Sequence, residues 1–245
     1  MTTINRTKLK SLYTSWPSGT PLTSAELAAG GISADLAVHY ARAGWLTRLA
    51  RGLYARPADK LELHPCLLVL QRQIDGLHVG GMSAFDWYGV RQYIAQRPVL
   101  TLYGWTAGRL PEWFMDRFPA EYHRKRLFEE HPTAPLHADP YEKRLNAPRV
   151  SAPERAFLEI LSEVGVRQSL QEARELGESS YGLRAGVLRE LLQRCTSVKT
   201  VRLCLEIGRG LASPWAEKLD PTELPTGSAR AWVSRSADGL LVLKP

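Results

Sequence analysis

Residues 22–56 read LTSAELAAGGISADLAVHYARAGWLTRLARGLYAR, and this stretch decides the fold of the N-terminal region. Two short helical patterns flank Gly30–Gly31, a pair that favours a sharp turn because glycine tolerates positive φ angles. Alternating residues at 45–49 and 53–56 then predict two strands joined by a turn at 50–52. Two helices at a sharp turn followed by a small hairpin outline a winged helix-turn-helix, which places one helix in the major groove of DNA.

Capping residues mark where both helices of this motif begin. Thr23 is followed by Glu26 at the spacing of a capping box, in which each side chain satisfies a backbone N–H of the other residue. Ser33 is expected to cap the second helix, which runs over 34–43. An amphipathic pattern at 5–16 predicts a further helix ahead of the motif.

The second helix carries a polar stripe. Asp35, His39 and Arg42 lie at helical spacing on one face. Base edges are read by side chains that donate or accept hydrogen bonds, so this stripe suits a recognition helix. The alternative is an ordinary solvated face, which would be favoured for an isolated helix. The glycine turn that precedes this helix favours the interpretation as a recognition helix.

The predicted hairpin is rich in arginine. Arg51 is expected at its tip, where a wing contacts phosphate or the minor groove, and Arg48 and Arg56 stand on either side. The alternative is that these arginines only solubilise the edge of a strand. Lys8 and Lys10, on the preceding helix, would add salt-sensitive phosphate contacts.

The distribution of charge agrees with this interpretation. The whole chain carries a net charge of +7. Residues 1–60 hold eight lysines and arginines against three acidic residues, whereas residues 61–148 hold ten of each and residues 149–245 hold fourteen against twelve. The positive surplus therefore lies mainly on the segment that would face a phosphate backbone.

Composition restricts the class of protein. With 44% hydrophobic and 23% charged residues over 245 positions, the chain is expected to be globular. It contains no run of about 18 apolar residues, and its N-terminus lacks the pattern of a secretory signal, so neither a membrane span nor export is expected. Its three cysteines, none in a CxxC pattern, are expected to stay reduced in a cytoplasmic protein.

The remainder, residues 61–245, is expected to form a mixed α+β domain after an N-terminal domain of residues 1–60. Residues 98–103 predict a strand. The basic tetrad HRKR at 123–126 is interpreted as part of a surface strand, with a phosphate contact as the alternative. The stretch EEHPTAPLHADP at 129–140 is interpreted as a loop because of its prolines.

From residue 151 onward the predicted domain is rich in helices. Ser151, Pro153 and Glu154 are spaced as an N-cap, a first-turn proline and the third residue of a capping box. Further helices are predicted over 169–176, within LRAGVLRELLQRC at 183–195 and over 198–211, and the chain is expected to end in a hairpin turning at 238–239.

No catalytic motif in the sequence is complete. Gly80–Gly81–Met82–Ser83 has the glycine–serine opening of a nucleotidyltransferase, but Asp86 lacks the second closely spaced carboxylate that Mg²⁺ would need. No Glu-x-Lys or Asp-x-Lys of a nuclease occurs, and no histidine stands at metal-ligand spacing. The sequence therefore predicts a protein that is not an enzyme and needs no cofactor or metal.

Three blocks together resemble one family. GWLTRLARGLYAR at 44–56, SAPERAFLEIL at 151–161 and SVKTVRLCLEIG at 197–208 are similar, in that order, to AbiEi-type antitoxins of bacterial type IV toxin–antitoxin systems. The resemblance implies a winged helix that represses its own operon at inverted repeats of double-stranded DNA. It also implies an antitoxin domain that counteracts a nucleotidyltransferase-like toxin without a stable complex. A solitary regulator acting through a protein partner, and a nucleotidyltransferase-type enzyme, remain as alternatives.

The resemblance also indicates residues. In the second domain it points to Glu154, Arg155 and Arg202, and a Glu–Arg pair at a helix start often fixes packing between helices. The predicted DNA-contacting set comprises Lys8, Lys10, Thr23, Ser33, Asp35, His39, Arg42, Arg48, Arg51 and Arg56.

Overall fold

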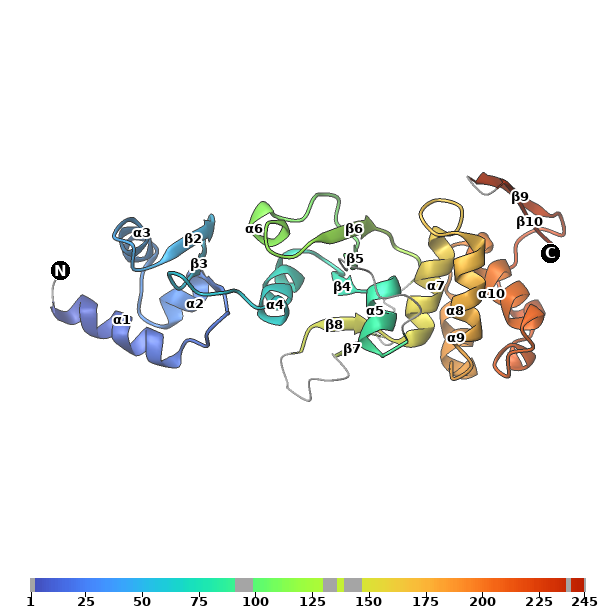
Figure 1. The fold of residues 1–245 in the computed structure, drawn as a ribbon, viewed down its shortest axis with the longest axis horizontal. Helices are drawn as coiled ribbons and strands as arrows, with labels where there is room; N and C mark the ends of the chain where they lie inside the picture. Colours follow the sequence, from blue (N-terminus) through green and yellow to red (C-terminus); the bar gives the residue numbers. More distant parts are fainter. Residues whose placement is uncertain (1–2, 91–98, 130–135, 139–146, 237–238, 245) are drawn as a thin grey trace. The chain divides into compact units, whose positions relative to one another are not determined.

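The computed structural model describes residues 3–90, 99–129, 136–138, 147–236 and 239–244, and its internal contacts divide the chain into two units (Figure 1). Unit 1 comprises Met1–Gln73 with Arg109–Pro119, and unit 2 comprises Ile74–Gly108 with Ala120–Pro245. The contacts thus group residues up to Gln73 with the N-terminal module, whereas the boundary expected from the sequence at residue 60 stays a prediction.

Unit 1 contains the winged helix. Its elements run in the order α1 (Thr3–Ser15), β1 (Leu22–Thr23), α2 (Ser24–Ala29), α3 (Ala34–Arg42), β2 (Thr47–Ala50), β3 (Leu53–Ala55), α4 (Leu63–Gln73) and, after a long excursion of the chain, α6 (Glu112–Met115). The two wing strands pair antiparallel, as the alternation predicted. The strand β1 was not predicted; it pairs with the outer side of β3 and closes a three-stranded sheet.

Local capping fixes the helix-turn-helix. The hydroxyl of Thr23 accepts from the backbone N–H of Glu26 at 3.3 Å, and the Glu26 carboxylate accepts from the N–H of Thr23 at 2.7 Å, so the predicted capping box is confirmed. Ser33 accepts from the N–H of Leu36 at 3.3 Å and caps α3, also as predicted. Gly31 lies in the turn with φ at +81°, a conformation that favours glycine.

One apolar core joins the first three helices to the wing. Trp16, directly after α1, Tyr40 of α3 and Tyr54 of β3 are each at most 3% exposed and belong to the same cluster. The helix predicted over 5–16 therefore packs as part of the winged helix, and its burial contributes to fixing the face that α3 presents.

Unit 2 is built on a mixed five-stranded sheet in the order β6-β5-β4-β8-β7. β5 pairs parallel with β6 and antiparallel with β4, while β8 pairs parallel with β4 and antiparallel with β7. The strands are β4 (His78–Val79), β5 (Leu100–Gly104), β6 (Ala120–Arg124), β7 (Leu136–Ala138) and β8 (Arg149–Ser151).

One strand corrects the sequence interpretation. β7 lies inside 129–140, which was expected to be a loop, and His137 pairs with Val150 of β8. The strand lies in a proline-rich stretch, so no local sequence pattern predicts it. The other residues of that stretch from 130 to 135, with 139 and 140, lie outside the described residues.

Helices cover the sheet and continue beyond it. They are α5 (Gly81–Trp87), α7 (Pro153–Glu163), α8 (Leu170–Glu178), α9 (Ala185–Gln193) and α10 (Val198–Gly210), followed by short 3₁₀ turns η1 (Ala216–Lys218) and η2 (Pro221–Glu223) and a hairpin of β9 (Trp232–Ser236) and β10 (Gly239–Leu243). The mixed α+β class and the helix-rich C-terminal part are as predicted. No described helix is long and apolar enough to cross a membrane.

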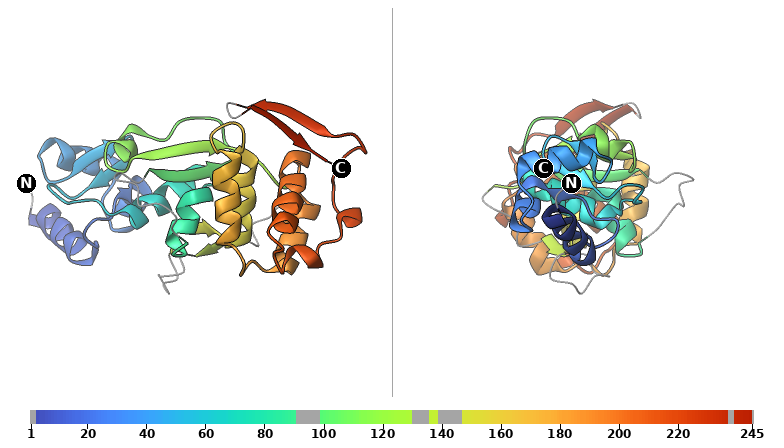
Figure 2. Two further views of the ribbon diagram at one scale, coloured as in Figure 1. Left: turned by 45° about the vertical axis from the view of Figure 1, so that its right-hand side comes forward. Right: turned by 90° about the vertical axis from the view of Figure 1, so that its left-hand side faces the viewer.

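The helix α7 forms the centre of unit 2. It contacts α5, α8, α9, α10 and β8, and Figures 1 and 2 show it beside the other helices of the C-terminal part. Every residue from Glu154 to Glu163 is buried, including four charged ones. Burying a charge is costly unless it is paired, so the partners of these side chains define the interior of the unit.

The start of α7 differs from the prediction. Its N-cap is Ala152, which has no side-chain cap, and Ser151 is instead the last residue of β8. The Ser151 hydroxyl donates to the carboxylate of Glu159, eight residues further along the chain in α7, at 2.9–3.0 Å. The predicted capping box is therefore wrong, because tertiary partners engage both Ser151 and Glu154.

Candidate nucleic-acid interface

The polar stripe of α3 faces solvent. Asp35, His39 and Arg42 are exposed, whereas Ala37 and Tyr40, on the opposite face, are fully buried in the core of unit 1. The helix is therefore oriented with its predicted reading face outward, as a recognition helix requires.

The wing presents cationic side chains. Arg48 and Arg51 are exposed, and the β2–β3 register shifts between Arg48 and Ala50. The Nε of Arg48 donates to the carbonyl of Ala50 at 3.4 Å. Within the described ranges neither Arg42 nor Arg51 forms an ion pair, so their guanidinium groups are free to meet phosphate.

Arg56 differs from the other wing arginines. It is half-buried, its Nη2 donates to the carbonyl of Tyr13 at 2.8 Å, and its guanidinium lies 5.5 and 5.7 Å from the ring centres of Tyr13 and Trp16. The hydrogen bond and the cation–π attraction thus hold the Arg56 side chain, and with it the wing, against α1. This geometry gives Arg56 a structural role, and its predicted DNA contact stays a prediction.

Thr23 and the two lysines complete the predicted set. Thr23 uses its hydroxyl in the capping box, which favours a structural role for it as well. Ser33 and Lys10 are exposed. The side chain of Lys8 lies outside the described part of the chain.

One exposed residue was missed by sequence reasoning. Trp45, between α3 and β2, is 43% exposed. The hydroxyl of Tyr13 donates to its backbone carbonyl, which anchors this junction to α1. The position of Trp45, directly after the glycine that ends α3, could have indicated an exposed aromatic residue. The strand predicted over 45–49 explained the same residue equally well.

The motif residues of unit 2 are engaged internally. Glu154 accepts from the backbone N–H, Nε and Nη2 of Arg184 at 2.8–2.9 Å. Burial raises the pKa of the Glu154 carboxyl, but the hydrogen bonds and charge of Arg184 outweigh it and lower the pKa overall. Since Arg184 precedes α9, this contact fixes α9 against the start of α7.

Arg155 belongs to a fully buried network around Glu159. Its Nε donates to Glu159 at 2.8 Å, and its guanidinium lies 5.1 Å from the ring centre of Phe128. Glu159 is also contacted by Nε2 of His78 at 2.9 Å and by the N–H of Gly81 at 3.0 Å. Burial raises the pKa of Glu159, but the charges and hydrogen bonds of His78 and Arg155 outweigh it and lower the pKa to about 2.

This network explains the glycine–serine motif that resembled a catalytic opening. A Cβ on Gly80 would stand 2.4 Å from Oε2 of Glu159, so close packing requires glycine. The Ser83 hydroxyl accepts from the N–H of Thr101 at 2.8 Å. These contacts give the motif a structural function.

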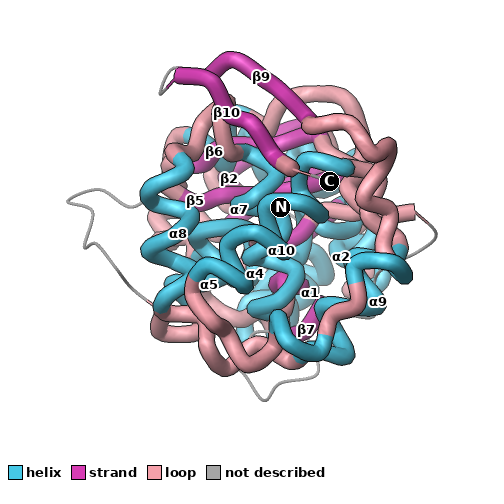
Figure 3. Tube along the Cα trace, turned by 90° about the vertical axis from the view of Figure 1, so that its right-hand side faces the viewer, coloured by secondary structure: helices cyan, strands magenta, loops and turns pink. Residues whose placement is uncertain are grey.

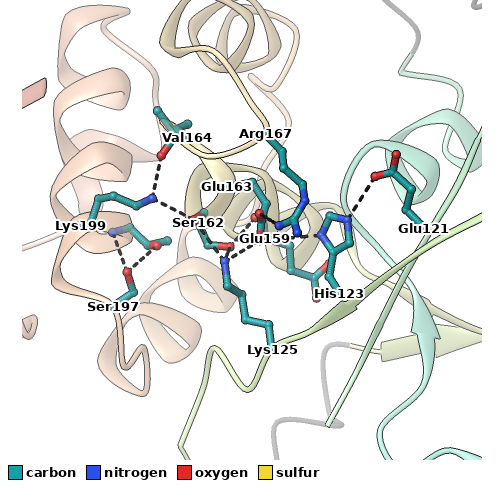
Figure 4. Close-up of polar contacts among 11 residues, drawn as sticks. Glu121, His123, Lys125, Glu159, Ser162, Glu163, Val164, Arg167, Ser197 and Lys199 are labelled. Atoms are coloured by element: carbon teal, nitrogen blue, oxygen red, sulfur yellow. Dashed lines mark hydrogen bonds and ion pairs between the residues drawn. The ribbon is translucent and has the colours of Figure 1, made fainter. Parts of the chain in front are cut away.

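A second charge cluster, which the sequence did not indicate, surrounds the other end of α7 (Figure 4). Glu163 accepts from Nζ of Lys125 at 2.5 Å and from Nη1 of Arg167 at 2.9 Å, and its Oε1 stands 3.8 Å from Nδ1 of His123. Burial raises the pKa of Glu163, but the nearby His123 ring and the hydrogen bonds and charge of Lys125 and Arg167 outweigh it, so the pKa is lowered. Lys199 donates to the carbonyls of Ser162 and Val164 at 2.9 and 2.7 Å.

Two lysines therefore occupy the negative end of the α7 dipole, a favourable place for cations. Burial and the neighbouring Lys125 lower the pKa of Lys199. An open hollow of about 550 Å³, lined in part by His123 and Arg167, lies beside the cluster.

Arg202 holds the C-terminal segment. Its guanidinium is buried and donates to four backbone carbonyls: those of Thr226, Ser228, Arg230 and Leu243, at 2.5–3.2 Å. These bonds join α10 to the segment that leads into β9 and to Leu243 at the end of β10. The geometry supports a structural role for the third motif residue too.

Comparisons with known proteins agree with the two-part architecture. A family model described as transcriptional regulator, AbiEi antitoxin, type IV TA system matches residues 97–244, and a model of the AbiEi antitoxin N-terminal domain matches residues 5–96. No curated protein matches. The chain is similar to the crystal structure of the RV2827C protein from Mycobacterium tuberculosis, with a TM-score of 0.58 and 16% identity over 96% of this chain and 90% of the other. At this identity the likeness concerns the fold alone.

Proposed function

Because the chain belongs to the AbiEi antitoxins, the transcriptional regulators of type IV toxin–antitoxin systems, we propose that unit 1 represses its own operon by binding operator DNA. In this proposal α3 enters the major groove at inverted repeats. The wing contacts the neighbouring phosphate backbone or minor groove.

The contrast among the arginines is the observation that carries this proposal. Arg42 on α3 and Arg51 on the wing are exposed and have no ion-pair partner among the described residues, while Arg56 is held by Tyr13. Exposed cations on two adjacent elements, beside the polar stripe of Asp35 and His39, provide both phosphate contacts and base-reading groups.

The same proposal assigns unit 2 an antitoxin role against a nucleotidyltransferase-like toxin, without a stable complex. Glu154, Arg155 and Arg202 all bond within unit 2, which fits residues that stabilise the domain and form no part of a contact surface. The internal contacts of Gly80 and Ser83 also favour a regulator over an enzyme.

Repression is tested with a reporter gene placed behind the DNA upstream of the chain's own reading frame. The chain is expected to lower reporter expression, and Arg42→Ala and Arg51→Ala are expected to relieve it. Arg194→Ala is the matched control, because Arg194 is an exposed cation of unit 2 and its loss changes net charge equally. Equal repression by all four proteins would refute the assignment of the interface.

Antitoxin activity is tested separately, by co-expressing the chain with the neighbouring nucleotidyltransferase-like reading frame under a foreign promoter. Rescue of growth is expected from the native chain and from Arg51→Ala alike, because transcription no longer depends on the operator. Failure of rescue by well-expressed native protein would contradict the antitoxin part while leaving DNA binding intact.

A further inference from the structure

A groove runs between α10 and the terminal hairpin of unit 2. Its volume is about 420 Å³. Leu205 of α10, Pro221 and Val242 of β10 supply apolar surface, and Arg209 and Lys244 supply basic groups. Val242 is 47% exposed, although a β-branched apolar residue on a strand is usually covered.

The hairpin presents more apolar surface on its outer face. Val233 pairs across the ladder with Val242, and both are exposed together with Leu240. Leu241 and Leu243, on the other face, are buried, and β10 contacts α10. Figure 3 shows the hairpin as two adjacent strands at the C-terminal end of the chain.

One edge of β10 faces away from its partner strand. In the described part of the chain β10 pairs only with β9. Ser236 and Gly239 pair across two intervening residues, so they form a hydrogen-bonded pair, and Leu241 with Ser234 and Leu243 with Trp232 repeat it along the ladder. Because N–H and C=O groups of alternate residues point to the same side of an antiparallel strand, those of Leu240 and Val242 face the outer edge. An outer edge with donors and acceptors beside a helix accommodates an added strand.

The charge of the groove indicates which kind of occupant it would bind. Arg209 and Lys244 are exposed, and the one carboxylate of the described lining, Glu206, lies 3.6 Å from Arg174. A second copy of this chain would bring its own Lys244 with its β10 and place like charges together. An occupant that carries carboxylates is electrostatically complementary.

We propose that the groove between α10 and β10 binds an extended acidic segment of a partner protein as an additional strand on β10. Carboxylates of the segment meet Arg209 and Lys244, and its alternating apolar side chains pack on Leu205 and Val242. Arg202 prearranges the site, since it holds the end of β10 through the carbonyl of Leu243 and the segment before β9 through three further carbonyls. The proposal does not depend on DNA binding by unit 1.

Fluorescence polarisation with the full chain tests this proposal. The probe is a labelled octapeptide in which valine alternates with glutamate, and the comparison peptide alternates valine with lysine. The acidic peptide is expected to bind about tenfold more tightly or better, and Arg209→Glu with Lys244→Glu to abolish the preference. Arg194→Glu is the matched control, and thermal unfolding establishes that each variant is folded.

Backbone pairing is tested with a third peptide, which keeps the acidic sequence but carries N-methyl groups on alternate amides along one edge. Each of the two possible edges is methylated in turn, and one of the two peptides is expected to lose binding. Absence of saturable binding by the acidic peptide up to about 1 mM, equal binding of the acidic and basic peptides, or full binding by both methylated peptides would overturn the proposal. Concentration-dependent dimers that Lys244→Glu does not weaken would also overturn it, in favour of a second copy.

Discussion

Glu154 at the start of α7 is paired with Arg184, which directly precedes α9. The carboxylate of Glu154 has a side-chain exposure of 2% and receives three hydrogen bonds from Arg184, one of them from the backbone N–H. The pair explains how a carboxylate can stand in a fully buried helix. It also places the family motif inside the protein, where it determines how two helices pack.

The Glu154–Arg184 contact should be measurable as a coupling energy. In a double-mutant cycle of Glu154→Gln and Arg184→Met, we expect a coupling of about 1–2 kcal/mol, reduced by the exposure of the Arg184 side chain. Urea unfolding of the four proteins measures it. Additive effects would show that the two side chains are independent.

Substitutions of Arg56 and Arg51 should have different effects, the first on stability and the second on DNA binding. Arg56→Ala removes the bond to Tyr13 and the stacking on two aromatic rings, so we expect a loss of about 1–2 kcal/mol in the free energy of unfolding. Arg51→Ala should leave that free energy nearly unchanged. If Arg56→Ala instead left the stability intact and weakened DNA binding as Arg51→Ala does, Arg56 would be a DNA contact.

Acid should unfold unit 2 partly through Glu159. Its pKa is about 2 in the folded protein and near 4.5 when unperturbed. A lowered folded pKa means that the stabilisation is fully present above about pH 4.5 and is lost as the pH falls toward 2. Glu163, whose pKa is also lowered, acts in the same direction.

The measurement is the free energy of unfolding between about pH 6 and pH 2.5. Glu159→Gln should be less stable at neutral pH and show a flatter decline on acidification, whereas Glu178→Gln, at an exposed position, should follow the native curve. Parallel curves for native protein and Glu159→Gln would contradict the assignment of the buried network.

Arg202 should control the order of the C-terminal hairpin. Arg202→Met keeps an apolar side chain of similar length but removes all four carbonyl bonds. Amide hydrogen exchange is expected to become faster throughout β10 while α7 stays protected, because α7 has other partners. Unchanged exchange in β10 would show that Leu241 and Leu243 hold the hairpin by packing alone.

The parts of the fold that follow from local sequence were predictable. The capping box of Thr23 and Glu26, the Ser33 cap and the outward stripe of α3 depend on residues within one or two turns of each other. The strand β1 was missed because two residues carry no periodicity, and its existence depends on pairing with the distant Tyr54.

The interior of unit 2 could not be predicted in the same way. Ser151 and Glu154 have the spacing of a capping box, but in the structure Ser151 donates to Glu159 and Glu154 accepts from Arg184. A buried carboxylate is costly unless donors satisfy it, so these contacts replace the capping box. The partners His78 and Lys125 come from strands and loops far away in the sequence. Only the tertiary structure brings these groups together.

The salt dependence of operator binding tests the central claim most directly. Fluorescence anisotropy with a labelled fragment of the chain's own upstream DNA gives the affinity of native protein, Arg51→Ala and Arg194→Ala at several salt concentrations. We predict that Arg51→Ala weakens binding to operator and to unrelated DNA alike and flattens the slope of log K against log salt by about one unit, while Arg194→Ala leaves both unchanged. Identical slopes and affinities for all three proteins would contradict the proposal that this winged helix binds DNA through its wing.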